Sequence, residues 1–188
     1  LNYKPKYPIQ VIENFSDIDV KLNLENNYER YLLYVGNVGF AHDMSYLDEL
    51  IEKTEFKIKF KLSGVPKYHK RKNPNLEMIY ANQFVEVIEK RLSLIDLSNL
   101  IDNSFATLIF LGDNYDKVLF PCKIYSSLSR CIPLVFVGNK DNYVCNWIIN
   151  NNFGIHFSEI DDLEKNRKSI LKSIMNYNST KKNNVPIL

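Results

Sequence analysis

The sequence contains few cysteines and no long apolar stretch, and these absences exclude several classes of protein. The three cysteines, Cys122, Cys131 and Cys145, are odd in number and form no CxxC pair, so neither a disulfide framework nor a zinc site is indicated. No run of about 18 uncharged apolar residues is present to span a membrane. The first residues lack the apolar core of a signal peptide. We therefore expect a protein of the reducing cytoplasm.

An excess of charge of either sign is also missing. The 24 lysines and arginines nearly balance the 22 aspartates and glutamates, and the net charge is +2. No global field therefore directs the protein to nucleic acid or to a membrane surface. The 188 residues, 45% of them hydrophobic, suffice for one globular domain with a buried core. The asparagine- and lysine-rich residues 178–185 are expected to fray.

Short β-rich runs alternate with helical patterns along the chain. Strands are predicted at residues 31–35, 58–63, 84–88, 106–111, 134–137 and 154–157. Helices are predicted at 43–51, with Asp43 as the N-cap, and at 94–101, 121–130, 143–151 and 162–176. Because strands that alternate with single helices need crossover connections, the pattern predicts a Rossmann-like three-layer α/β/α fold with a mostly parallel six-stranded sheet. We expect residues 1–19 to form a linker and entry segment, 20–177 the domain and 178–188 a flexible tail.

In such sheets ligands bind at the carboxyl ends of the strands, where loops and helix N-termini converge. The loop after the first strand contains Gly36, Asn37 and Gly39, and its glycines allow the backbone to approach a ligand closely. A plain tight turn is the alternative interpretation. The loop after the second strand contains Gly64 and a basic cluster that either faces solvent or contacts a phosphate or an anionic lipid: Lys67, Lys70, Arg71 and Lys72.

The fourth strand leads to a helix that is predicted to begin at Pro121. Proline suits the first helical turn, because its fixed φ is already helical and its missing N–H is not needed there. Free backbone amides at a helix start, together with the helix macrodipole, favour an anion. We therefore expect a diphosphate site at this helix, and an ordinary amphipathic crossover helix is the alternative. Its apolar positions are Ile124, Tyr125 and Leu128.

The segment FPCKIYSSLSRCIPLVFV, residues 120–137, resembles the helix and strand PSK-[IL]-[YF]-x-x-L-A-x-G-x-P-[VI] of retaining glycosyltransferases with the GT-B architecture. Five further pieces resemble the family in order along the chain: IQVIENFSDID, LLYVGNVGFAHDMSYL, FKLSGVP, NNNFGIHF and SEIDDLEKN. The resemblance covers residues 9–177. It implies the carboxyl-terminal, donor-binding half of a GT-B fold, which works with an acceptor-binding N-terminal domain or a partner subunit.

The resemblance also assigns residues. It places the family's loop glycines at Gly36 and Gly39, under the sugar and diphosphate of the donor, and a further glycine at Gly64. Lys123 corresponds to the lysine of the PSK motif. The helix amides that are then expected to face the distal phosphate are those of Cys122, Lys123 and Ile124.

The chain departs from the family at its charged positions. Two glutamates of many relatives fall at Val118 and Ser126, of which Ser126 can still form a hydrogen bond to a ribose hydroxyl. Asp113 and Asp116 either replace these carboxylates or are ordinary loop acids. The basic residues that many relatives carry after the first strand are also absent. The charge of the leaving diphosphate is then left to Lys67 and Lys123.

The three histidines fit structural roles at least as well as functional ones. His42 either assists at the phosphate or caps a turn, and His69 and His156 are interpreted as loop and strand-end residues. No cluster of histidine, cysteine and acidic residues has metal-ligand spacing, so we expect neither a bound metal nor a cofactor besides the nucleotide-sugar substrate.

The resemblance implies a hexosyltransferase-like enzyme that is inactive without an acceptor-binding domain. It would transfer a sugar, with retention, from a nucleotide-diphospho-sugar to a saccharide or lipid-linked acceptor in surface polysaccharide synthesis. Contact with the inner membrane face would then be peripheral. No catalytic residue can be assigned, and no nucleic-acid partner is expected. Two alternatives stay open: a nucleotide-sugar epimerase of the same architecture, against which Lys123 argues, and a degenerate, non-catalytic domain that binds a partner glycosyltransferase.

Overall fold

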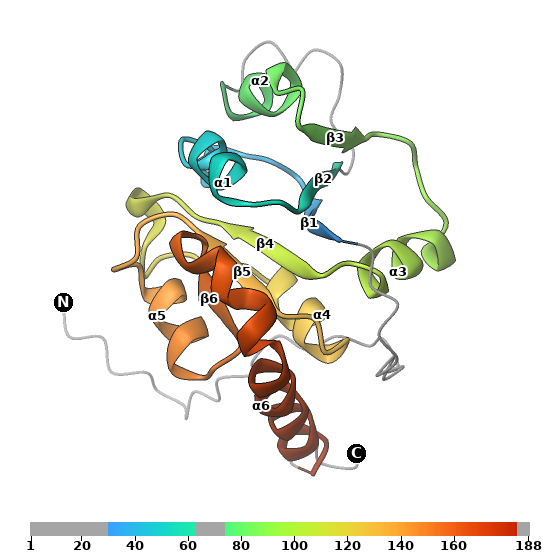
Figure 1. Cartoon of the computed structure of the whole chain (residues 1–188), viewed down its shortest axis with the longest axis vertical. Helices are drawn as coiled ribbons and strands as arrows, with labels where there is room; N and C mark the ends of the chain where they lie inside the picture. The colour runs from blue at the N-terminus through green and yellow to red at the C-terminus, as the bar shows by residue number, and fades with distance from the viewer. Residues whose placement is uncertain (1–29, 63–73, 184–188) are drawn as a thin grey trace, which may run out of the picture.

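The computed structural model describes residues 30–62 and 74–183, and its centre is a six-stranded parallel sheet (Figure 1). The strand order is β3-β2-β1-β4-β5-β6, and each neighbouring pair is parallel. The predicted Rossmann-like α/β fold is therefore confirmed. All six predicted strands are present: β1 (Tyr31–Gly36), β2 (Lys57–Leu62), β3 (Val85–Ile88), β4 (Ala106–Phe110), β5 (Leu134–Val137) and β6 (Gly154–His156).

Helices connect the strands and flank the sheet (Figure 1). The five predicted helices are present, whereas α2 and two short 3-10 helices were not predicted. Among the helices of the described ranges, none combines the length and the hydrophobicity that a membrane crossing needs. The helices are α1 (Leu47–Lys53), α2 (Pro74–Ala81), α3 (Leu94–Asp102), α4 (Lys123–Ser129), α5 (Tyr143–Asn150) and α6 (Leu163–Asn183), with the 3-10 helices η1 (Asp113–Tyr115) and η2 (Phe157–Asp162).

Two helix ends differ from the expectation. Asp43 is not the cap of α1: its carboxylate accepts a hydrogen bond from the N–H of Ser45 at 2.9 Å, and α1 begins at Leu47, so Asp43 closes a turn before the helix. Helix α6 continues to Asn183 instead of ending at 176. The side chain of Asn178 donates a hydrogen bond to the carbonyl of Leu128 at 2.8 Å, which ties α6 to the end of α4 beyond the expected domain boundary. The expected entry segment, residues 1–19, lies outside the described residues, as do residues 184–188.

The centre of the sheet is fully buried. Every residue of β4 and β5 is buried, which explains their continuous apolar sequences, because a strand covered by helices on both faces has no side that faces solvent. Tyr34 of β1 lies beside Phe60 of β2 in the strand register. Its ring packs against the rings of Phe60 and Phe110 with centroids 5.1 and 5.9 Å apart. This aromatic cluster fixes Tyr34 near the carboxyl end of β1.

Helix α3 has the predicted apolar periodicity but contains no buried residue. Leu94 and Ile95 are 85% and 73% exposed, and Leu97 and Leu100 are only partly buried. The helix is held by polar contacts as well: the hydroxyl of Tyr31 donates to the carbonyl of Leu100 at 2.5 Å. The spacing of apolar residues therefore predicted the helix correctly but not how deeply it is buried.

The last turn of α3 is joined to α4 by an ion pair that is mostly enclosed. The guanidinium of Arg130 donates to Asp102 at 2.5 Å and to the hydroxyl of Ser98 at 2.9 Å, and its side chain is only 6% exposed. Replacing Asp102 by alanine should destabilise the domain by about 2–3 kcal/mol, because the buried Arg130 loses its counter-charge. Lys53→Ala, in the exposed pair of Lys53 with Glu49, is the control and should cost about 0.5 kcal/mol or less. Urea unfolding measures both. Equal midpoints for the two variants would contradict this assignment.

Candidate functional site

Between β1 and β4 the sheet has a topological switch point, where the connections leave toward opposite edges of the sheet. From β1 the chain continues to β2 on one side, whereas β4, which lies next to β1 on the other side, leads to β5. Loops after two such strands diverge, and ligands of open α/β sheets bind outside the carboxyl ends at this point. The two loops are tied together here, since the N–H of Gly112, after β4, donates to the carbonyl of Ala41, after β1, at 2.9 Å. We call the place where these two loops meet the switch-point site; it comprises Gly36, with Tyr34, His42 and Lys123 around it.

The loop after β1 is held by two polar side chains. Gly36 has a φ of 137°, a conformation that residues with a side chain rarely adopt. The hydroxyl of Tyr34 donates to the carbonyl of Asn37 at 2.6 Å. The N–H of Gly39 donates to Nδ1 of His42 at 3.0 Å, and the N–H of His42 donates back to the carbonyl of Gly39 at 3.1 Å. His42 thus caps a turn, which is one of the two roles predicted for it.

The helix after β4 begins two residues later than expected. Pro121 is buried and precedes α4, Cys122 is exposed, and the helix starts at Lys123. The amide of Ile124 donates to the carbonyl of Pro121 at 3.1 Å. It is therefore not available to a ligand, contrary to the prediction. Among the described residues, the amides of Cys122 and Lys123 have no hydrogen-bond partner. Two of the three expected amide donors therefore remain at this helix start.

The side chain of Lys123 crosses from α4 to the loop after β1. Its Nζ lies 3.8 Å from the centroid of the Tyr34 ring and 3.4 Å from Nε2 of His42. A methyl group added at Gly36 would lie 3.8 Å from the same Nζ. The structure therefore brings together Gly36 and Lys123, two residues that were predicted to share a site. It adds Tyr34 and His42 as their nearest polar neighbours.

Burial dominates the electrostatics of this group. It lowers the pKa of Lys123 from its ordinary 10.5 to about 7, and no carboxylate of the described residues pairs with the amine to oppose this shift. Burial and the neighbouring Lys123 lower the pKa of His42 to about 4. Burial raises the pKa of the Tyr34 phenol. The switch-point site is thus a neutral, partly enclosed set of donors at pH values above about 7.

The two acids predicted either to replace the missing glutamates or to be loop acids form hydrogen bonds with other parts of the chain. One carboxylate oxygen of Asp113 accepts a hydrogen bond from the side chain of Asn139 at 3.3 Å. Asp116 accepts one from the amide of Tyr143 at 2.7 Å, so it holds the start of α5. These contacts fit the interpretation of both as loop acids. The hydroxyl of Ser126 donates to the carbonyl of Lys123 at 2.8 Å, which leaves its oxygen lone pairs as acceptors.

Several other predicted residues do not join the group at Gly36. Val118, where relatives carry a glutamate, is 82% exposed in the loop before α4. His156 is buried at the end of β6, where its ring bonds to the carbonyl of Gly138 at 2.8 Å, as expected of a strand-end residue. Gly64, Lys67 and His69 lie outside the described residues.

Sequence reasoning missed Tyr34, although a signal was present. Alternate residues of a strand lie on the same face of the sheet, so Tyr34 shares its face with Gly36, the glycine already assigned to the site. A tyrosine two positions before such a glycine is therefore expected to contact the same ligand or side chain as the glycine.

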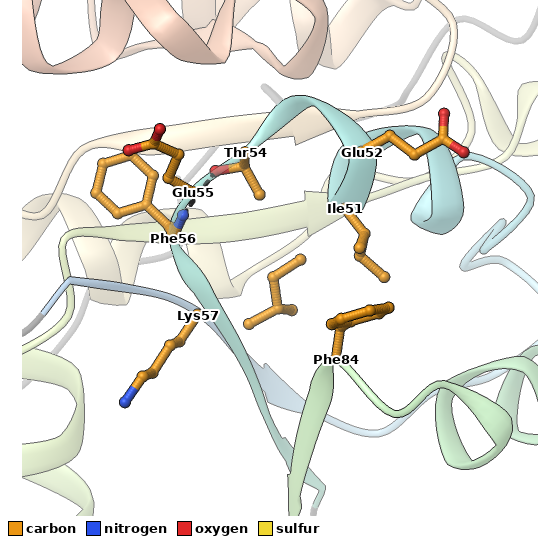
Figure 2. Close-up of a pocket in the computed structure, with 8 residues that line it drawn as sticks. Ile51, Glu52, Thr54, Glu55, Phe56, Lys57 and Phe84 are labelled. Atoms are coloured by element: carbon orange, nitrogen blue, oxygen red, sulfur yellow. Dashed lines mark hydrogen bonds between the residues drawn. The ribbon is translucent and has the colours of Figure 1, made fainter.

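A hollow of about 450 Å³ is lined by residues that do not belong to this group (Figure 2). It is formed by the end of α1, the start of β2 and the residue before β3, with Ile51, Ile58 and Phe84 among its apolar walls. Ligand sites of open parallel sheets lie at the carboxyl ends of the strands, whereas this hollow lies at the amino ends of β2 and β3. It is therefore no part of the switch-point site.

The architecture matches one Rossmann-like half of a GT-B fold. The chain is similar to the C-terminal domain of a glycosyl transferase group 1 family protein, LpcC, from Francisella tularensis. The TM-score is 0.54 at 10% identity, over 82% of this chain and 87% of that domain. This likeness concerns the fold alone.

Two further matches are to larger proteins. The chain is similar, at 14% identity and a TM-score of 0.48, to a UDP-GlcNAc 2-epimerase from Methanocaldococcus jannaschii, over 79% of this chain and 38% of the epimerase. It is also similar, at 13% identity and a TM-score of 0.46, to the lipopolysaccharide outer core galactosyltransferase WaaB, over 92% of this chain and 56% of that enzyme. No protein-family model matches the sequence, and no curated protein sequence matches it. The chain thus spans about two fifths to little more than half of these two enzymes.

Proposed function

We propose that the chain binds the diphosphate of a nucleotide-sugar at the switch-point site. The observation that carries this proposal is the Lys123 amine, which lies at the Gly36 turn without a carboxylate partner among the described residues. A diphosphate supplies the counter-charge that the protonated amine lacks among the described residues, and the amides of Cys122 and Lys123 at the start of α4 are further donors. Gly36 keeps the space between the two loops free of a side chain.

In this proposal the chain is the donor-binding half of a retaining glycosyltransferase. The sugar would pass to a saccharide or lipid-linked acceptor in surface polysaccharide synthesis, held by an acceptor-binding domain or partner subunit. Asn37 and Gly39 belong to the loop nearest the donor, Ser126 offers an acceptor to a ribose hydroxyl, and Gly64 and Lys67 are proposed to approach from the loop after β2. No catalytic base is assigned.

The exposed thiol of Cys122 allows a direct test of binding. Cys131 and Cys145 are buried, so a maleimide should modify Cys122 first in the native protein. Bound UDP or a UDP-sugar should slow this modification severalfold, because the diphosphate would cover the helix start. Calorimetry on the Cys122→Ser variant, which keeps the backbone amide, should give the same affinity as the wild-type chain. Uridine, which lacks the diphosphate, is the control and should not protect. Equal modification rates with and without saturating UDP and UDP-sugars, together with no heat of binding for them, would rule out the proposal.

A further inference from the structure

The proton position on His42 is fixed by its surroundings. The backbone N–H of Gly39 donates to Nδ1 of His42 at 3.0 Å, so Nδ1 uses its lone pair and carries no hydrogen. A neutral imidazole has one N–H, which must then be on Nε2. A protonated imidazole would place a second N–H against the N–H of Gly39. The turn therefore selects the neutral ring with its hydrogen on Nε2.

This tautomer determines which form of Lys123 fits beside it. Nε2 of His42 lies 3.4 Å from Nζ of Lys123. An ammonium group has three donors and no lone pair, so it would face the Nε2–H donor to donor. An unprotonated amine has a lone pair that can accept from Nε2–H. The contact is therefore favourable only when Lys123 is unprotonated.

Two other groups of the described residues act on the charge of the amine. The face of the Tyr34 ring, on β1, lies 3.8 Å from Nζ and favours the ammonium form. The Tyr34 hydroxyl already donates its hydrogen to Asn37. Cys122, next to Lys123 in the chain, favours the charged form. Burial has the larger effect and lowers the pKa of Lys123 to about 7.

We infer that His42 is a positioning residue that, together with burial, holds the Lys123 amine unprotonated when no ligand is bound, so that a diphosphate is bound together with one proton from solvent. This inference rests on the proposed function. The proton bonds to Nζ, the ammonium turns from His42 toward a phosphate oxygen, and Nε2–H of His42 is released as a second donor to the anion. The charge of the ligand is thus met by a cation that forms only when the ligand arrives.

Calorimetry with UDP at pH 8, in two buffers of different ionisation enthalpy, measures the protons taken up on binding. The wild-type chain should take up about 0.9 proton per UDP, because an amine with a pKa of about 7 is mostly unprotonated at pH 8. In His42→Gln the side-chain carbonyl can accept from an ammonium, so uptake should fall below about half of the wild-type value. A structural role alone would change affinity without changing proton uptake. UDP that binds to the wild type with less than about 0.2 proton taken up would overturn the inference and leave the proposed function standing.

A measurement on the empty protein separates the two proposals. Nitrogen NMR should show His42 with its hydrogen on Nε2, and the Lys123 signal, assigned by its loss in Lys123→Met, should titrate near pH 7. That result supports the part of the inference that concerns the contact between His42 and Lys123, even if UDP does not bind. Titration near the ordinary 10.5 would overturn it whatever the binding experiment shows.

Discussion

Replacing Lys123 by methionine should weaken UDP binding by roughly 10- to 100-fold and, at the same time, stabilise the empty domain at pH 7. The loss of affinity follows from the proposed contact between the ammonium and the diphosphate, since a hydrogen bond to a charged group contributes about 1.5–3 kcal/mol. Methionine has a similar length and no charge, so it can fill the space beside Tyr34. The two effects have opposite signs, which distinguishes this variant from one that merely misfolds.

The gain in stability follows from the lowered pKa of Lys123. Keeping the amine unprotonated in the folded protein at pH 7 costs on the order of 4 kcal/mol, given an ordinary pKa of 10.5 and a folded value of about 7. Methionine removes this cost but leaves Nε2–H of His42 without an acceptor, a loss of about 1–3 kcal/mol. We therefore expect a net gain of about 2 kcal/mol in the free energy of unfolding at pH 7.

The pH dependence gives a second readout of the same change. Between pH 7 and 10.5 the unfolded chain binds more protons at Lys123 than the folded chain does, so this contribution makes the wild type more stable as pH rises. Lys123→Met lacks that rise, and its advantage over the wild type should shrink across the window. Lys140→Met is the control: Lys140 is exposed and pairs with Glu159 at the surface, so the stability should stay close to that of the wild type at every pH in the window. A variant less stable than wild type at pH 7, with unchanged UDP affinity, would contradict both arguments.

The sheet could be predicted from the sequence because its strands are continuous apolar runs between turn residues. β4 and β5 are buried on both faces. Continuous apolar runs as short as theirs indicate buried strands and not helices. Helix α2, Pro74–Ala81, was missed because its apolar residues do not form a marked stripe along one face. The burial of α3 was misjudged for a different reason: periodicity shows which face of a helix is apolar, not whether another element covers that face.

The candidate site was predictable only in part. Gly36 and Lys123 could be assigned because a glycine after a strand and a helix start after another strand meet at the same edge of a parallel sheet. The amide of Ile124 could not be excluded from the sequence, since its bond to Pro121 depends on where the helix begins. The tautomer of His42 was equally inaccessible, because it depends on the 3.0 Å contact with the N–H of Gly39.

Gly154→Ala should destabilise the domain by about 4 kcal/mol or more, although it adds only a single methyl group. Gly154 is the first residue of β6 and pairs with Leu134 of β5. A Cβ built at this position would lie 1.8 Å from the carbonyl oxygen of Leu134 and 2.6 Å from its carbonyl carbon. Both atoms belong to the backbone of a fully buried strand, so no side-chain rotation can relieve the overlap.

The sign of this prediction makes it a sharp test of the β5–β6 contact. A glycine inside a strand is otherwise less stable than alanine by roughly 0.5–1 kcal/mol, so without the overlap the substitution would stabilise the domain.

Gly39→Ala is the matched control, because its Cβ would lie 3.9 Å from Nδ1 of His42, an ordinary van der Waals distance. Denaturant unfolding should give a midpoint for Gly39→Ala close to the wild type and a much lower one for Gly154→Ala. Because whole domains are stable by only about 5–15 kcal/mol, a loss of this size removes a large share of the total stability. A wild-type midpoint for Gly154→Ala would mean that β6 does not approach β5 as closely as described here, and the position of α6 behind it would have to be revised.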